Sequence, residues 1–411
     1  MKEYKLNLQL FAAGDNINST GDNNLSAEMK TFYDKTLITL ASPYLVHDQF
    51  GQKRDIPKNG GKIIEFRKFS SLPKALTPLT EGVTPSGQKL NVSSVSASVE
   101  QYGDYVEQTD LLELTAVDNT IVEATKQLSA QAGLTMDTIV RNEIVGGTNV
   151  LYCPKVSGGT ETAVTSRSAI DSTSLLRVKD VFKAAAELKA MNAPKIDGYY
   201  VGIIHPYVAY DLMQEAGTQW MDVQKYASPE NMLNGEIGCL GGVRFVESTE
   251  AKIFCGENLA GSTRNLAVNG AVSASTTVTF DGGTVAANAL KGRYVIINGT
   301  KAKVTANTAT QLTLDNAVTA SDDAVIYPGE GGAEGGASFA TLIIGADAYG
   351  VTTVTGGGLE HIVKQKGYGN DPLNQRSSIG WKGLKTAKRL VEEYMIRIES
   401  GSAFSSTATA N

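Results

Sequence analysis

The stretch from residue 48 to residue 107 constrains the fold more than any other part of this sequence. It contains two extended segments, KIIEFRKF at 62–69 and LNVSSVSASVEQY at 90–102, joined by a loop rich in proline and glycine. The second segment alternates through Val95, Ala97 and Val99. Large apolar residues are sparse, and a two-stranded hairpin with so little core of its own is marginally stable in isolation. We therefore expect the hairpin to lie on a surface that a neighbouring subunit provides.

A long helical pattern follows from Leu111 to Gly146. Its apolar residues recur at helical spacing, and Gly146–Gly147 is a fitting stop signal. A helix of about 30 residues extends about 45 Å, which is longer than the usual helix of a globular domain. The pattern predicts a helix that serves as a spine.

The rest of the chain predicts an α/β unit interrupted by an insertion. Residues 175–258 alternate helical patterns with the strands YYVGIIHP and VRFVES, and the unit resumes at 339–366 with FATLIIGADAYGVTTV. Residues 259–336 are rich in Ala, Thr, Gly, Val and Asn, with short alternating runs such as YVIINGTKAKV. We expect them to form a small inserted β domain. The GEGGAEGGAS segment at its end is expected to be a flexible linker back to the α/β unit.

Both ends of the chain carry distinct patterns. Near the start, KLNLQLFA places Leu6, Leu8 and Leu10 on one side of an extended arm with Phe11 next to them, and a helix is expected from Ser26 to Leu45. An arm with an apolar edge usually docks, the alternative being a disordered tail. Near the end, the pattern of residues 377–399 predicts strands, and the composition of the final SAFSSTATAN predicts a disordered tail.

Composition narrows the class of protein. The net charge is −6, so generic binding to nucleic acid through clustered Lys and Arg is not expected. The three cysteines lack C-x-x-C spacing and predict reduced thiols. No run of 18 apolar residues indicates a membrane span, and the opening segment is too polar for a signal-peptide core. We expect a protein that stays in the cytoplasm where it is made.

The sequence contains no arrangement that predicts catalysis, a cofactor or a metal site. Its three histidines, His47, His205 and His361, lie far apart, and nucleophile-elbow, phosphate-loop and dinucleotide-binding motifs are absent from the sequence. Two rival classes stay open at this point. An enzyme with the β domain as a binding module needs convergent acidic or histidine residues, and an exported adhesive or surface-layer protein needs an export signal.

Charged residues of the hairpin region are candidates for contacts between subunits. The basic set comprises Arg54, Lys58, Lys62, Arg67 and Lys68. The acidic set that could complement it comprises Glu100, Asp104 and Glu107. Most such runs are solvated faces, and an interface with an oppositely charged neighbour is the functional alternative.

Several segments, in order, resemble the major capsid proteins of tailed bacteriophages, specifically the family of the N-four-like podophage coat protein. They are TIVEATKQLSAQAGLTMDTIVRNEIVGGTNV at 120–150, YVGIIHPYVAYDL at 200–212, GVRFVESTEAKIF at 242–254 and DPLNQRSSIGWKGLKTAKRLVEEYMIRIESGSA at 371–403. KLNLQLFA also resembles the starts of structural proteins from phages of Gram-positive bacteria. These segments, with the patterns between them, cover most of the chain outside 259–336.

The resemblance implies the α+β fold of tailed-phage capsid proteins, with an A-domain, a P-domain with a long spine helix, an E-loop hairpin and an N-terminal arm. The inserted β domain departs from the core pattern and is expected on the outer face. The implied parts are the N-terminal arm and helix at 1–47, the E-loop at 48–107, the P-domain with the spine at 108–174, the A-domain at 175–258 and 337–370, the β domain at 259–336, and the C-terminal P-domain strands and tail at 371–411.

The same resemblance implies how such a protein works. Identical chains would form pentamers and hexamers that close into an icosahedral shell around double-stranded DNA, as part of the virion or of a prophage's particles. It implies a separate scaffolding protein, because too little chain precedes the hairpin for a scaffolding domain. A portal protein at one vertex and a decoration protein are further implied partners.

Overall fold

A computed structural model describes residues 45–411, apart from 70–71, 80, 85–86, 116–119, 223–232, 234, 369–370 and 372. Residues 1–44 lie outside the described residues. They include the predicted arm with Leu6, Leu8, Leu10 and Phe11, and all of the helix predicted at 26–45 except its last residue. The chain divides into two compact units. The described part of unit 1 is Glu100–Thr135 and Val354–Lys385, and unit 2 is Leu45–Val99, Met136–Thr353 and Thr386–Asn411.

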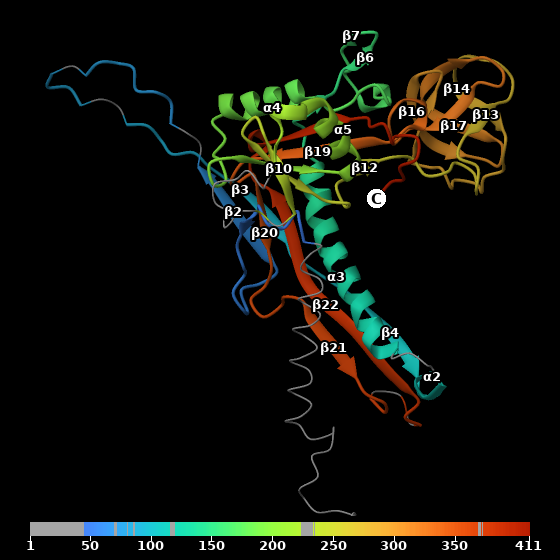
Figure 1. Ribbon diagram of the computed structural model, residues 1–411, viewed down its shortest axis with the longest axis horizontal. Coiled ribbons are helices and arrows are strands. Elements are labelled where there is room, and N and C mark those ends of the chain that lie inside the picture. Colours follow the sequence, from blue (N-terminus) through green and yellow to red (C-terminus); the bar gives the residue numbers. More distant parts are fainter. Residues whose placement is uncertain are drawn as a thin grey trace, which may run out of the picture. The chain divides into compact units, whose positions relative to one another are not determined.

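Unit 1 is a helix packed on a small antiparallel sheet. Its strands are β4 (Glu100–Thr109), β21 (Glu360–Lys364) and the first part of β22 (Arg376–Arg389), and β22 lies between the other two. The indole of Trp381 in β22 donates a hydrogen bond to Gln131 of α3 (Thr120–Val145) at 3.1 Å. One face of this sheet therefore lies against the helix (Figure 1).

The predicted spine helix is present as α3, which has 26 described residues, about 39 Å at the usual rise, and ends at Val145 just before the predicted glycine stop. The start of the predicted pattern contains the helix α2 (Asp110–Thr115), and residues 116–119 between α2 and α3 lie outside the described residues.

The core of unit 2 is an eight-stranded mixed sheet. Its strands, in spatial order, are β5 (Val150–Tyr152), β23 (Met395–Ser400), β19 (Ser338–Ile344), β8 (Tyr200–Ile204), β11 (Val243–Glu247), β10 (Glu236–Leu240) and β9 (Met221–Asp222), with β12 (Ile253–Phe254) beside β19. All five residues of β8 are buried, as expected for a strand covered on both faces.

Alternation along β8 builds two apolar layers. Tyr200 and Ile204 pack with α4 (Val178–Ala190) and α5 (Pro206–Ala216), whereas Val201 and Ile203 pack on the other face with Val140 and its neighbours on α3. α5 begins at Pro206, which suits the first turn of a helix, and the ring of His205 accepts a hydrogen bond from the Tyr207 N–H at 3.2 Å.

The hairpin consists of β2 (Ile63–Phe69) and β3 (Val92–Ser98), paired antiparallel. The expected single strand at 90–102 is wrong, since β4 follows β3 after Val99 and pairs with β22 instead. Residues at the root of the hairpin are buried, and Phe66 lies against Gly350 of β20 (Tyr349–Thr352), where an added Cβ would come within 2.7 Å of the ring. β20 also pairs with β1 (Gln52–Lys53) and with the last residues of β22.

The predicted β insertion is a closed barrel with its own apolar core (Figure 1). Its strands, in spatial order, are β13 (Leu266–Val268), β14 (Val272–Asp281), β17 (Gln311–Ala320), β16 (Thr300–Asn307), β15 (Tyr294–Ile297) and β18 (Val325–Pro328). Asn298 and Gly299 both have positive φ and form the two-residue turn between β15 and β16, as the Asn-Gly pair favours.

The glycine-rich segment after the barrel is packed rather than flexible. The Gly332 N–H donates to Gly336 O, and the Ala333 N–H donates to Ile170 O, each at 2.7 Å. A Cβ on Gly332 would lie 2.4 Å from Ile170 O. Glycine is needed here because two backbones approach closely, so the prediction of a flexible linker is wrong.

The end of the chain is ordered, so the prediction of a disordered tail is also wrong. The Ser402 hydroxyl donates to buried Asp211 at 2.7 Å, and Phe404 stacks on Tyr207 with ring centroids 4.5 Å apart. Asn411 accepts a hydrogen bond from the Ile253 N–H at 2.9 Å. A remaining small hairpin, β6 (Lys155–Ser157) with β7 (Thr160–Thr162), turns at two positive-φ glycines.

Candidate intersubunit contact sites

The basic residues predicted for subunit contacts lie along the hairpin and at its root. Arg54, Arg67 and Lys68 line one cavity of about 200 Å³ beside the buried Phe66 ring. The Arg54 guanidinium lies 5.9 Å from the centroid of that ring, and the Lys68 ammonium is 3.4 Å from Glu393. Both side chains of the Lys68–Glu393 pair are exposed, so the pair adds little stability. Arg54, Arg67 and Lys68 are all exposed to solvent.

Lys58 and Lys62 are exposed and do not line that cavity. The backbone of Lys62 closes the hairpin, because its carbonyl accepts a hydrogen bond from the Val99 N–H at 2.9 Å. Three of the five predicted cations therefore meet around one cavity, and the other two lie elsewhere on the surface of unit 2.

The predicted acidic residues, Glu100, Asp104 and Glu107, are exposed on β4 of unit 1. Asp104 accepts a hydrogen bond from the Gln131 side chain at 2.7 Å and another from the Tyr105 N–H at 2.8 Å. These hydrogen bonds, that of Gln131 first, hold the pKa of the Asp104 carboxyl below its usual range. Asp104 is thus a fixed negative charge at the rim of the sheet.

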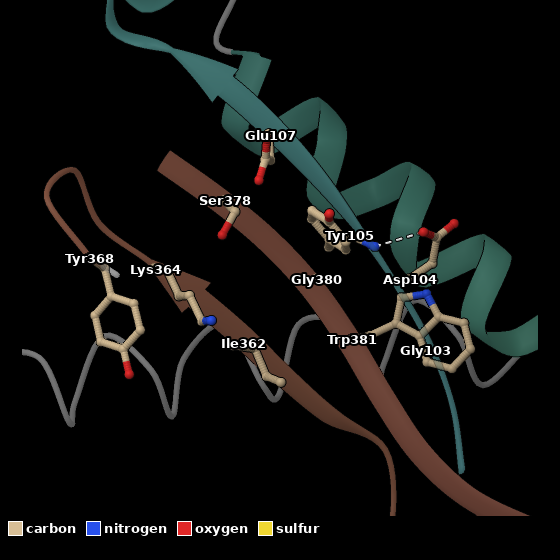
Figure 2. A pocket seen from close by; sticks show the side chains of 10 residues that line it. All are labelled: Gly103, Asp104, Tyr105, Glu107, Ile362, Lys364, Tyr368, Ser378, Gly380 and Trp381. Atoms are coloured by element: carbon tan, nitrogen blue, oxygen red, sulfur yellow. Dashed lines mark hydrogen bonds between the residues drawn. The ribbon is translucent and has the colours of Figure 1, made fainter. Parts of the chain in front are cut away.

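A groove that the sequence did not predict crosses the sheet of unit 1. It has a volume of about 580 Å³ and is lined by residues of β4, β21 and β22 and by Tyr368 of the following loop. Figure 2 shows Lys364 and Ile362 along β21, Ser378 on β22 and Tyr105 on β4. In antiparallel register Tyr105 lies opposite Gly380, and Glu107 lies opposite Ser378. These residues alternate with Trp381, so they lie on the face of the sheet away from α3.

Glycines inside the strands shape this groove. A Cβ on Gly380 would come within 2.7 Å of the Tyr105 side chain, and one on Gly103 would lie 2.5 Å from Trp381 O. Glycine within a strand marks the close approach of another group, and this was the one signal in the sequence that could have pointed to the site.

A buried polar cluster lies where the described chain of unit 2 begins. Asp137 of α3 accepts hydrogen bonds from the His47 N–H at 2.7 Å and from the His47 ring Nδ1 at 2.6 Å, and both side chains are fully buried. The Tyr349 hydroxyl donates to the His47 carbonyl. The cluster joins three segments of the chain and has no access for a substrate, so its role is structural. In the part of the chain that the structure describes, no group of His, Cys, Asp or Glu is arranged to hold a metal ion.

The comparison with protein families decides the class of this protein. A family model described as phage capsid protein matches residues 47–371. The chain belongs to the phage capsid protein family. The matched range contains the hairpin, α3, the barrel and every strand of the eight-stranded sheet except β23, and it ends just before β22.

Solved capsid structures have the same fold as this phage capsid protein. The capsid of the cyanophage P-SCSP1u is 15% identical, with a TM-score of 0.50 over 87% of this chain and 88% of that chain. The capsid of Ralstonia phage GP4 is 13% identical, with a TM-score of 0.55 over 86% of this chain and 87% of that chain. The comparison with curated proteins found no match.

The resemblance stated from the sequence, the α+β capsid fold and the structural role are thereby confirmed. The phage capsid protein is a structural component of the head shell and of the virion, where it assembles with other copies. Neither rival class, the enzyme nor the adhesive surface protein, fits this family. Among the described helices, none combines the length and the apolar character needed to span a membrane.

Proposed function

We propose that this capsid protein assembles through pentamers and hexamers into an icosahedral shell, with the hairpin as a principal contact between subunits. One observation carries the proposal. The hairpin and its tip expose large apolar side chains that no part of the described chain covers, among them Leu76 and Leu79, which are 81% and 77% exposed. The others are Ile63, Leu72, Val83, Leu90 and Val92. A soluble protein rarely leaves this many large apolar side chains exposed on one segment, and a partner surface is the usual reason for it.

The energetics of this surface favour assembly. Full burial of one leucine side chain contributes about 1.5–3 kcal/mol. Several such side chains on one hairpin offset the ordering cost of a contact, and a closed shell repeats that contact in every subunit. Each contact can then be modest while the shell as a whole is stable.

The two units support an assignment of the domains named by the resemblance. We assign the eight-stranded sheet with α4 and α5 to the A-domain, and the helix α3 with the sheet of unit 1 to the P-domain. The hairpin, from residue 48 to Val99, would be the E-loop, so that β4 belongs with the P-domain. The barrel forms a separate folded module with its own core, which suits a place on the outer face, away from the contacts that close the shell.

Further partners are part of the proposal. A separate scaffolding protein would guide assembly in the host cytoplasm, a portal protein would occupy one vertex, and a decoration protein would bind outside. The shell would enclose double-stranded DNA without binding a particular sequence, and the net charge of −6 suits a wall that does not grip its contents.

The charged hairpin residues give a direct test. We expect Arg54→Glu, Lys62→Glu and Arg67→Glu together to prevent particle formation, because reversal replaces attraction to the acidic β4 residues of a neighbour with repulsion. Lys291→Glu with Lys303→Glu, two exposed sites on the barrel, is the control and should leave assembly unchanged. Particle yield is measured by sedimentation and negative-stain microscopy. Normal yields from the hairpin variant would remove these cations from the contact.

A further inference from the structure

The last described residues of unit 2 cross the surface of α5 as a strap. Residues 402–411, named here the tail strap, contain no helix or strand. The Ser402 hydroxyl at the start of the strap donates to buried Asp211 of α5 at 2.7 Å. Two residues later, the ring of Phe404 stacks on Tyr207 of the same helix, with centroids 4.5 Å apart. A hydrogen bond and an aromatic stack therefore fasten the strap to α5.

A buried histidine lies behind this stack. The ring of His205 is 7% exposed and meets Tyr207 edge to face at 4.8 Å and Phe339 of β19 at 5.2 Å between centroids. Its Nδ1 accepts a hydrogen bond from the Tyr207 N–H and so caps α5. A ring nitrogen accepts a hydrogen bond only while it carries no proton. The capped helix and the closed stack therefore require a neutral His205.

The described elements that cover the His205 ring bring no charge to it. β19 and residues 402–408 are uncharged along their whole length. The charged residues of α5 and of β11, the strand beside β8, are Asp211, Glu215, Arg244 and Glu247. Burial, rather than any of these charges, lowers the pKa of His205 to about 4 from an ordinary 6.5. The closed form is therefore fully favoured above pH 6.5, and this advantage is lost as the pH falls toward 4.

Among the elements that cover His205, the tail strap opens at the least cost. β19 lies between β8 and β23 inside the eight-stranded sheet, and all seven of its residues are buried. Phe404 of the strap is only partly buried. Local opening begins in segments that have few buried contacts. Acid should therefore open the strap before it disturbs the sheet.

We infer that His205 is an acid-sensitive latch for the tail strap. When Nδ1 takes up a proton from solvent, it can no longer accept the Tyr207 N–H, and the first turn of α5 loses its cap. Tyr207 then shifts from its stack with Phe404, and the strap leaves the helix. Opening uncovers the aromatic side chains of Tyr207 and Tyr210. The device belongs to one subunit and does not depend on the assembly of a shell.

Hydrogen exchange on the purified, unaltered subunit tests the latch, with rates corrected for the intrinsic effect of pH. The amides of Ser405, Thr407 and Ala408 report on the strap, because each donates to a carbonyl within it. Strap opening should increase about thirtyfold between pH 7.5 and pH 5, since His205 binds its proton far more readily in the open form. Barrel amides, which belong to a separate core, are the internal control and should change less than about twofold. An unchanged strap, or an equal change in the barrel, would overturn the latch.

Two variants separate the latch from general sensitivity to acid. His205→Asn retains an oxygen that caps α5 but binds no proton in this range, so strap opening should be the same at both pH values. Phe404→Leu keeps an apolar side chain without the ring, so the strap should lose its pH response while the Tyr207 amide keeps its own. A thirtyfold response of the strap in either variant would refute the inference, because it would then arise without the histidine or without the stack.

Discussion

Replacing Asp137 with alanine should strongly destabilise unit 2. Asp137 is fully buried and accepts two hydrogen bonds from His47, one from the backbone N–H at 2.7 Å and one involving ring Nδ1 at 2.6 Å. The alanine variant leaves both groups of His47 buried without an acceptor. The same residue holds the start of the described chain, at residues 45–50, against α3.

The expected loss follows from these two hydrogen bonds. A buried hydrogen-bonding group left without its partner costs about 1–3 kcal/mol, and the substitution leaves two such groups, the backbone N–H and the ring Nδ1 of His47. We expect about 3–5 kcal/mol for Asp137→Ala. Asp137→Asn retains an oxygen for the His47 N–H and should lose about half as much. Because domains are stable by only about 5–15 kcal/mol, the alanine change takes a large share of the total.

The chain provides its own probes for this measurement. It has two tryptophans, Trp381 in unit 1 and Trp220 in unit 2, and both are buried. In a Trp381→Phe background, urea unfolding followed by fluorescence reports on unit 2 through Trp220. With a slope near 3 kcal/mol/M, the midpoint should fall by about 1–1.7 M for Asp137→Ala.

Thr138→Ala, at the next position of α3, is the control and should change the free energy of unfolding by less than about 1 kcal/mol. If Asp137→Ala and the control give the same midpoint, the buried pair does not stabilise unit 2 and the reasoning fails.

Other parts of unit 2 give further predictions. Burial lowers the pKa of His205 to about 4 from an ordinary 6.5, so the unfolded state binds its proton first as the pH falls. Protonation of His205 should therefore lower the free energy of unfolding by about 3 kcal/mol between pH 6.5 and pH 4. The variant His205→Asn can still cap α5, and it should remove this contribution to the pH dependence when unfolding is followed in urea titrations. Ala274 has a φ of 45° at a bulge in β14, so Ala274→Gly should raise the thermal midpoint of the barrel by relieving about 1 kcal/mol of strain, and a lowered midpoint would contradict this. Asp211→Ala removes the acceptor of the Ser402 hydroxyl, so limited proteolysis should cleave the C-terminal tail sooner, whereas an unchanged cleavage rate would mean that other contacts hold it.

Local patterns in the sequence predicted the elements whose causes are local. The strand at 200–204 was predictable because it is an apolar run between helical patterns, and the structure buries all of it. The strands on either side of Asn298–Gly299 fall in the alternating run YVIINGTKAKV, and the turn itself, which was not predicted, has a local cause because both residues adopt positive φ readily. The helix α5 lies within the helical pattern expected in 175–258, and its start has a local cause, because Pro206 suits the first turn of a helix.

Other features could not be predicted, because their causes lie in contacts between distant segments. Small residues in the GEGGAEGGAS segment suggested flexibility, but Gly332 is needed where the backbone meets Ile170 O. The tail was predicted to be disordered from its composition, although Ser402 reaches Asp211 from far along the chain. Composition alone does not separate a loose segment from a closely packed one.

The groove shows the same limit for the candidate site. The basic and acidic sets were visible in the sequence, but the groove depends on the pairing of β4 with β22, which are far apart along the chain. Only Gly103 and Gly380 could have indicated the groove, because glycines inside strands mark the close approach of another group. Leu76 and Leu79, which are exposed at the hairpin tip, fall in the segment predicted as a loop and were not singled out.

The most direct test of shell assembly is negative-stain microscopy of the purified chain, expressed alone and together with a candidate scaffolding protein. We expect closed icosahedral particles, or rings of five and six subunits, under at least one of these conditions, and we expect them to be lost in the hairpin charge-reversal variant. A chain that stays monomeric under both conditions, while its circular dichroism shows it to be folded, would contradict the claim that this protein closes into a shell through its hairpin.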